Sequence, residues 1–179
     1  MRSFLRWLVS HMSSPRVIYD REGKSPYLSR YYIIGRPYMA DGSEPIDRFG
    51  NPKPEAIFPK TLGFAIYLHK FHRSDDDNAL HNHPWEWARS LILAGGYSEE
   101  RREPDRETVV RRTIRPGDWV KINADHFHRV DLLEDDSWSF FIAGPKTSDW
   151  GFWERESGAS GPTIPWREFI ARIRGASWQ

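Results

Sequence analysis

The chain has 179 residues, a length that predicts one structural domain, and its 39% hydrophobic and 28% charged residues exclude a disordered chain and a coiled coil. Its 26 Lys and Arg against 25 Asp and Glu leave a formal net charge of +1, so we expect no binding to nucleic acid through bulk charge. Cysteine is absent, which excludes disulfides, thiolate-bound metals and a cysteine nucleophile, and is typical of a cytoplasmic protein. No apolar run approaches the roughly 20 residues of a membrane span, so we expect no membrane partner.

The predicted elements begin with a short helix and continue as a series of strands. Met1–Val9 combines a basic start with apolar residues, and we expect an amphipathic helix that packs on the body rather than a secretory signal. Residues 36–60 hold five prolines and two glycines and predict a long irregular loop. The predicted strands are rich in β-branched and aromatic residues: Arg30–Ile34, Leu62–Phe71, Trp87–Leu93, Thr108–Ile114, Trp119–Ile122, Phe127–Leu133 and Trp138–Ile142. Short strands separated by turn residues at this spacing indicate a β-sandwich or β-barrel.

Three further segments interrupt or follow the strands. The runs Asp75–Asp77 and Glu99–Arg106 are strongly charged, and we expect a solvated turn and an exposed hairpin, respectively. Gly144–Trp153 combines turn residues with three aromatic rings. It is interpreted either as a flap over the mouth of the barrel or, preferably, as a turn that packs its rings on the core.

The end of the chain predicts a second helix. Apolar residues recur there at the helical spacing i, i+3, i+4 and i+7, namely Trp166, Phe169, Ile170 and Ile173. Pro165 suits the first turn of this helix and Gly175 suits its end. We expect the helix to cover one face of the β-structure.

Two His-x-His pairs are the strongest functional signal in the chain. Residues two apart on a strand point to the same face, roughly 6–7 Å apart, so their imidazoles can converge on one metal ion. The pairs are His81-Asn82-His83 and His126-Phe127-His128. We expect the other two histidines of this region to be buried residues with ordinary hydrogen-bond partners; these are His69 and His72.

The surroundings of both pairs resemble the two motifs of the cupin family. The segment from His81 to Gly95 is similar to the first motif: His-x-His, a short polar stretch, a hydrophobic strand and a glycine. The segment from Gly117 to His128 is similar to the second, in which Gly-Asp opens a turn and a histidine follows the glycine by eleven positions. On this alignment His128 rather than His126 takes the ligand position.

The resemblance covers residues 62–145 and implies an all-β fold, a single jelly-roll-like antiparallel β-barrel with short N-terminal and C-terminal helices. It implies a divalent metal ion in the mouth of the barrel, held by His81, His83 and His128. We divide the chain into an N-terminal extension and irregular loop (1–60), the cupin barrel (61–153) and the C-terminal helix (154–179), which together form one structural domain.

The ligand set departs from the common cupin pattern. Many cupins place a glutamate four or five residues after the second histidine, where this chain has Trp87 and Ala88. Glu86 comes one position early, which on a strand points it to the opposite face. Whether Glu86 or His126 is a fourth ligand stays open.

A three-histidine site without a carboxylate is similar to that of the thiol dioxygenase branch of cupins. The stretches Ile122-Asn123 and His128-Arg129-Val130 are similar to that branch, whereas its cysteine–tyrosine feature is absent. The branch carries an arginine for the substrate carboxylate on an early segment, which Arg30-Tyr31-Tyr32 resembles. This resemblance implies a mononuclear non-haem iron dioxygenase, with iron(II) favoured over zinc, manganese or nickel.

Three neutral imidazoles leave the full charge of the ion in the pocket, which favours a small anionic substrate. An arginine at the mouth would bind a substrate carboxylate through two parallel hydrogen bonds. The expected catalytic residues are Arg30 and Arg89, with Ser90 as a further polar group of the pocket. Arg36 and Arg129 are alternative arginines.

Two other functions remain open from the sequence. One is a redox-neutral isomerase or epimerase that acts on a sugar or sugar nucleotide, and the other is a cupin that binds a small molecule without catalysis. In each case the expected partners are a small molecule and a second copy of the chain in a homodimer.

Overall fold

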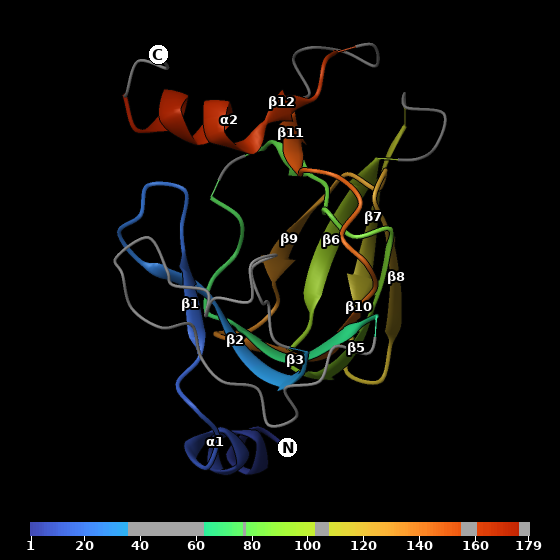
Figure 1. Ribbon diagram of the computed structural model, residues 1–179. Coiled ribbons are helices and arrows are strands. Elements are labelled where there is room, and N and C mark those ends of the chain that lie inside the picture. Colours follow the sequence, from blue (N-terminus) through green and yellow to red (C-terminus); the bar gives the residue numbers. More distant parts are fainter. Residues whose placement is uncertain (36–62, 77, 103–107, 155–160, 176–179) are drawn as a thin grey trace.

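The computed structural model describes residues 1–35, 63–76, 78–102, 108–154 and 161–175 (Figure 1). Within these residues the strands form two six-stranded sheets in which neighbouring strands pair antiparallel. The first sheet has the spatial order β1 (Arg16–Tyr19), β2 (Pro26–Ile34), β3 (Ala65–Phe71), β10 (Ser137–Ala143), β5 (Trp87–Ala94), β8 (Trp119–Asn123). The second has the order β12 (Ile164–Pro165), β11 (Gly151–Trp153), β4 (Leu80–His81), β9 (His128–Leu132), β6 (Tyr97–Arg102), β7 (Val109–Ile114).

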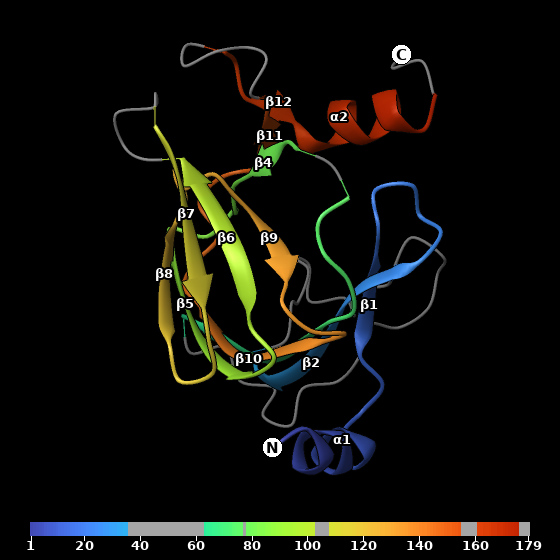
Figure 2. The same cartoon turned by 180° about the vertical axis from the view of Figure 1, so that it is seen from behind.

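The chain passes from one sheet to the other at most connections between β3 and β11. Of the described strands in this stretch, only β6 and β7 are neighbours both in sequence and in one sheet. Alternation of this kind between two antiparallel sheets is the jelly-roll arrangement of cupins. The predicted all-β class with two short helices is therefore confirmed. One detail differs, because the strands form two facing sheets that are not closed into a single barrel (Figure 2).

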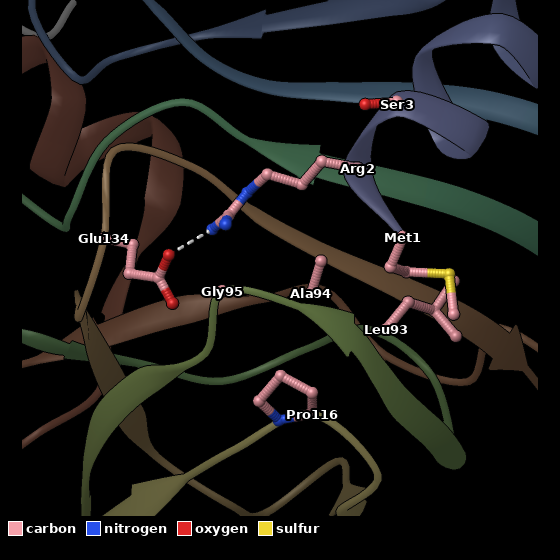
Figure 3. Close-up of a pocket in the computed structure, with 8 residues that line it drawn as sticks. All are labelled: Met1, Arg2, Ser3, Leu93, Ala94, Gly95, Pro116 and Glu134. Carbon is pink, nitrogen blue, oxygen red and sulfur yellow. Dashed lines mark ion pairs between the residues drawn. The ribbon is translucent and has the colours of Figure 1, made fainter.

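Helix α1 (Arg2–Ser10) covers the outer face of the first sheet, as expected for an amphipathic N-terminal helix. Its buried Leu5 packs against Leu68 and Trp138. Arg2 donates a hydrogen bond from Nε to Asp136 Oδ1 at 2.7 Å, and a shallow hollow beside this contact holds the ion pair between Arg2 and Glu134 at 2.8 Å (Figure 3). Burial alone would raise the pKa of Asp136, but its hydrogen bonds and the nearby charges of Arg2 and Lys70 together outweigh burial, and the pKa is lowered.

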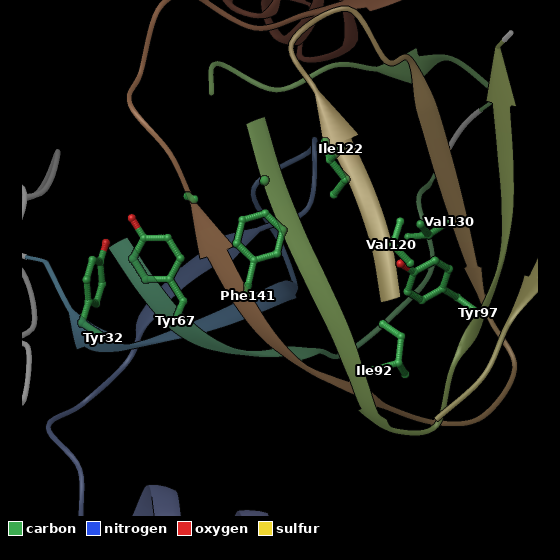
Figure 4. Packing of buried hydrophobic residues seen from close by; sticks show 10 residues of the cluster. Tyr32, Tyr67, Ile92, Tyr97, Val120, Ile122, Val130 and Phe141 are labelled. Carbon is green, nitrogen blue, oxygen red and sulfur yellow. The ribbon is translucent and has the colours of Figure 1, made fainter. Parts of the chain in front are cut away.

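The main core lies between the two sheets (Figure 4). Strand β5 explains how it is filled, because its side chains alternate strictly between buried and half-buried positions. Ala88, Ser90 and Ile92 point inward, whereas Trp87 and Arg89 lie on the other face. The first sheet contributes the rings of Tyr32, Tyr67 and Phe141, and the second sheet contributes Tyr97 and Val130.

A glycine pair makes the passage from β5 in the first sheet to β6 in the second. Gly95 and Gly96 have φ values of 76° and 111°, a region that side chains with a Cβ rarely adopt. A Cβ at Gly95 would also collide with the carbonyl oxygen of Asp136. Because of this tight turn, β6 crosses to the second sheet, where it pairs with β9.

Helix α2 (Trp166–Ile173) packs on β11 and β12 at the end of the second sheet (Figure 1). The ring of Phe169 stacks on Phe152 with centroids 4.0 Å apart, and Trp166 stacks on Trp150 at 5.5 Å. The aromatic rings at the end of the segment 144–153 thus pack against α2 and β12, which agrees with the preferred interpretation of that segment.

Each of the seven strand predictions coincides with a strand, although β2 begins four residues earlier than expected. Residues 1–60, expected as an extension and a loop, include β1 and β2 of the first sheet. The predicted loop 36–60 lies outside the described residues. No helix in the described part of the chain is long and apolar enough to cross a membrane.

Candidate metal centre

Three histidines from two distant parts of the chain converge. His81 in β4 lies directly opposite His128 in β9, and His83 follows His81 by two residues. The Nε2 atoms of His83 and His128 are 2.9 Å apart, and the ring centroids of the three imidazoles are 4.9 to 5.1 Å apart. One ring nitrogen from each histidine lies within 4.8 Å of the others. The backbone ladder therefore places two of these side chains, and the turn after β4 places the third.

The spacing of these nitrogens suits a shared cation. Two nitrogens bound to one ion at roughly 2.0–2.1 Å, with a right angle between the bonds, are about 3 Å apart. The separation of 2.9 Å between His83 and His128 matches this arrangement. The group of His81, His83 and His128 could therefore bind a divalent metal, with imidazole nitrogen as its only donor type.

Asn82 fixes the turn that carries His83. Its side chain donates from Nδ2 to the carbonyl of Ala124 at 2.9 Å and accepts at Oδ1 from the backbone N–H of Gly151 at 2.7 Å. The backbone N–H of Asn82 also donates to the carbonyl of Gly151 at 3.1 Å. These bonds tie the His-x-His segment to the turn after β8 and to the start of β11.

The environment keeps His81 and His83 neutral. Burial lowers the pKa of His81 and His83 well below the usual value, and the neighbouring His128 lowers both further. Both imidazoles are therefore uncharged near neutral pH, and each has a free lone pair. His128 is held differently, because its Nδ1 lies 2.6 Å from Glu99 Oε1.

The three histidines line a cavity of about 80 Å³. Among the expected catalytic residues, Arg30 and Ser90 line it as well, and Ser90 is only 4% exposed. The remaining lining residues are largely aromatic or apolar: Tyr27, Leu28, His69, Phe71, Trp85, Tyr97, Ile122, Val130 and Phe141. A small polar end and a large apolar wall are typical of a small-molecule site.

Among the described candidate arginines, Arg30 is the one that lines this cavity. Its Nε donates to His69 Nε2 at 3.0 Å, and its guanidinium lies over the rings of Tyr67 and Trp85, 4.8 and 5.5 Å from their centroids. Held along one edge and by two rings, the guanidinium can offer its terminal nitrogens to a ligand. The bond to Arg30 gives His69 the ordinary partner that we expected, as Ser29 does for His72 at 2.8 Å between Oγ and Nε2.

Other predicted site residues lie elsewhere. Arg89 is on the outer face of β5 and donates to the carbonyl of its neighbour Ala88 at 2.7 Å. His126 precedes β9, and its Nδ1 lies 3.1 Å from Nη1 of Arg101, so it does not belong to the three-histidine group. Glu86 is exposed and is likewise outside the group. Of the alternative arginines, Arg129 pairs with Asp131 at 2.7 Å, whereas Arg36 lies outside the described residues.

Two buried carboxylates beside the histidines were missed from the sequence. Glu99, expected in an exposed hairpin, has no exposed surface. Asp75, expected in a solvated turn, is 9% exposed, accepts a hydrogen bond from the backbone N–H of Val130 at 2.7 Å, and lies 3.9 Å from Nδ1 of His81. Both expectations were wrong because these charged residues are paired within the fold.

No protein-family model and no curated protein matches the chain, but solved structures resemble it weakly. Oxalate oxidase in complex with glycolate is 14% identical over 51% of this chain and 46% of its own, with a TM-score of 0.41. The DMSP lyase DddQ from Ruegeria pomeroyi DSS-3 is 19% identical over 66% of this chain and 47% of its own, at 0.43. KdgF from Halomonas sp. is 16% identical over 67% of this chain and 80% of its own, at 0.41.

The matched regions span less than half of the first two of these proteins. At such identities and TM-scores the similarities assign no activity to this chain. The jelly-roll order of the two sheets and the histidine group between them fit a cupin.

Proposed function

We propose that this chain is a metal-dependent enzyme that transforms a small anionic molecule, and more specifically a mononuclear iron(II) dioxygenase. The observation that carries this proposal is the convergence of His81, His83 and His128 in one cavity. Three neutral imidazoles on one side of an ion leave its other positions for ligands, as in three-ligand non-haem iron sites.

The charge of the cavity supports an anionic substrate. Among the residues that the structure describes, no carboxylate belongs to the ligand group, so an ion held there would keep its full positive charge. Arg30 adds a second positive charge to the same lining. A carboxylate or thiolate is attracted to such a cavity, whereas a cation is repelled.

The size of the cavity supports a small substrate. About 80 Å³ is far below the roughly 300–1,000 Å³ of pockets for drug-sized ligands. A site of this size favours a molecule of a few non-hydrogen atoms over a sugar nucleotide. The iron dioxygenase is therefore preferred to the isomerase of nucleotide-linked sugars.

Each residue then has a definite task. A bound iron(II) would supply the redox chemistry. His81, His83 and His128 hold the ion, and the terminal nitrogens of Arg30 bind a substrate carboxylate through two parallel hydrogen bonds. The hydroxyl of Ser90 offers a further hydrogen bond from the wall of the cavity. The rings that line the cavity exclude water from the reacting molecule.

Anaerobic purification followed by metal analysis and oxygen-uptake assays tests this function. We expect one iron per chain and oxygen consumption with a member of a panel of small thiols and carboxylates, and metal-free protein as the control consumes none. Protein that takes up no metal would overturn the proposal. If iron-loaded protein is inert towards the whole panel, the dioxygenase is overturned in favour of a binding protein. If turnover is unchanged when zinc replaces iron, the dioxygenase is overturned in favour of a redox-neutral enzyme.

A further inference from the structure

Glu99 is a buried carboxylate in direct contact with one of the candidate ligands. On β6 it lies opposite Val130 of β9, so His128 is its diagonal neighbour across the two strands. Glu99 Oε1 is 2.6 Å from His128 Nδ1, a short distance typical of a charge-assisted hydrogen bond. The side chain of Glu99 has no exposed surface.

Two arginines lock this carboxylate in place. Arg101 Nη2 donates to Oε1 at 2.9 Å, and Arg112 Nη2, from the residue opposite Glu99 on β7, donates to Oε2 at 2.6 Å. Burial alone would raise the pKa of Glu99, but the hydrogen bonds and charges of His128, Arg101 and Arg112 outweigh burial and hold the pKa well below its usual range. Both oxygens are engaged, so the carboxylate has one orientation.

Stabilisation of the fold does not explain this buried cluster of charges. Burying a charged cluster is expensive, and apolar residues of similar volume fill such positions at least as well. The specific result of the cluster is that the Nδ1–H of His128 has a fixed acceptor. A histidine bonded in this way at Nδ1 has its free lone pair at Nε2, the atom that lies 2.9 Å from His83.

We infer that Glu99 is a positioning residue of the metal centre, which selects the tautomer and ring orientation of His128 and thereby strengthens cation binding. The inference rests on the proposed metal site. When a carboxylate accepts a hydrogen bond from the second ring nitrogen of a metal-binding histidine, removing that carboxylate typically lowers metal affinity by about 10–100-fold.

The arginines add a second property. Because Arg101 and Arg112 offset the negative charge of Glu99, the carboxylate orients His128 without neutralising the bound cation. The cavity therefore keeps the positive charge that attracts an anionic substrate. Orientation and charge are thus controlled by separate groups.

The test measures the affinity of the whole protein for cobalt(II), a probe with a visible spectrum, in the wild type and in Glu99→Ala and Glu99→Gln. We expect Glu99→Ala to raise the dissociation constant by about 10–100-fold and to alter the visible bands of the bound ion. Glu99→Gln keeps an oxygen acceptor for the Nδ1–H of His128, so we expect a smaller loss. The matched control is Glu100→Gln, the next residue on β6, which pairs with Arg129 at 3.3 Å and lies on the other face. We expect it to bind cobalt(II) as the wild type does.

The outcomes separate the inference from the function on which it rests. If the wild type binds no metal, the proposed metal site fails. If the wild type binds cobalt(II) and Glu99→Ala and Glu99→Gln bind it equally well, only the inference fails. Nitrogen-15 NMR of the histidines in the metal-free wild type needs no variant to fold: a proton on Nδ1 of His128 supports the inference, and a proton on its Nε2 overturns it.

Discussion

The most direct prediction compares His83→Ala with His72→Ala in a thermal unfolding experiment with added divalent metal. His83 shares the cavity with the other two candidate ligands, whereas His72 bonds Ser29 and lies outside the group. Both variants remove one imidazole from the same region of the chain. They differ in whether that imidazole belongs to the metal centre.

The size of the effect follows from binding linkage. Free metal at 100 times its dissociation constant stabilises the folded wild type by about 2.7 kcal/mol. For a chain of this length about 1 kcal/mol raises the melting temperature by about 2–4 °C, so we expect a rise of about 5–10 °C. If losing His83 weakens binding by about 100-fold, the same metal concentration stabilises the variant by only about 0.4 kcal/mol, or about 1 °C.

The assay records the melting temperature of each protein with iron(II), zinc, manganese and nickel, against a chelator-treated sample. We expect His72→Ala to keep the full rise and His83→Ala to lose nearly all of it. A rise that survives in His83→Ala, or one that is lost in His72→Ala, would mean that the wrong imidazoles have been assigned.

Three further predictions concern the cavity and its support. Arg30→Met should raise KM for the anionic substrate by about 10–100-fold with unchanged metal content, since a charge-assisted pair is lost, whereas Arg89→Met should leave steady-state kinetics unchanged. Asp136→Asn should lower the free energy of unfolding in urea by about 1–2 kcal/mol at pH 7, because the N-terminal helix loses its charged partner. The folded pKa of Asp136 is lowered, so this loss should be complete above pH about 4 and shrink as the pH falls through the folded value. Phe169→Ala should destabilise the protein in urea by about 3–5 kcal/mol, and the exposed Ile173→Ala by about 0.5 kcal/mol or less.

The strands with a clear apolar pattern could be predicted from the sequence, and β6 could not. Tyr97–Arg102 carries two glutamates and two arginines, a composition typical of a solvated segment. In the fold, Glu99 is matched by Arg112 from the neighbouring strand and by His128, which lies 29 residues further along the chain. Pairings of this kind arise only when the strands come together, so composition alone gave the wrong burial. Strand β4 was missed for a simpler reason, because two residues are too short for any pattern.

The candidate ligands could be predicted because two of them are only two residues apart in the sequence. His-x-His predicts two imidazoles on one face, and the structure brings His81 and His83 together. The same expectation fails for His126 and His128, because the turn before β9 places His126 beside Arg101, whereas the turn after β4 keeps His83 beside His81. On β5, the alternation of side chains predicts that Arg89 and Ser90 point to opposite faces of the sheet. Which face lines the cavity depends on where the second sheet packs, and the sequence of β5 alone does not determine this.

The direct opposition of His81 and His128 in the β4–β9 ladder has a consequence for how this centre tolerates change. Main-chain pairing, rather than a flexible loop, sets the distance between these two imidazoles. These two ligands of the proposed site are therefore in place without a bound ion. Side chains that do not touch these imidazoles can be exchanged without changing that distance. A single inserted or deleted residue in either strand would move one imidazole to the opposite face of the sheet, and the three-histidine site would lose that ligand.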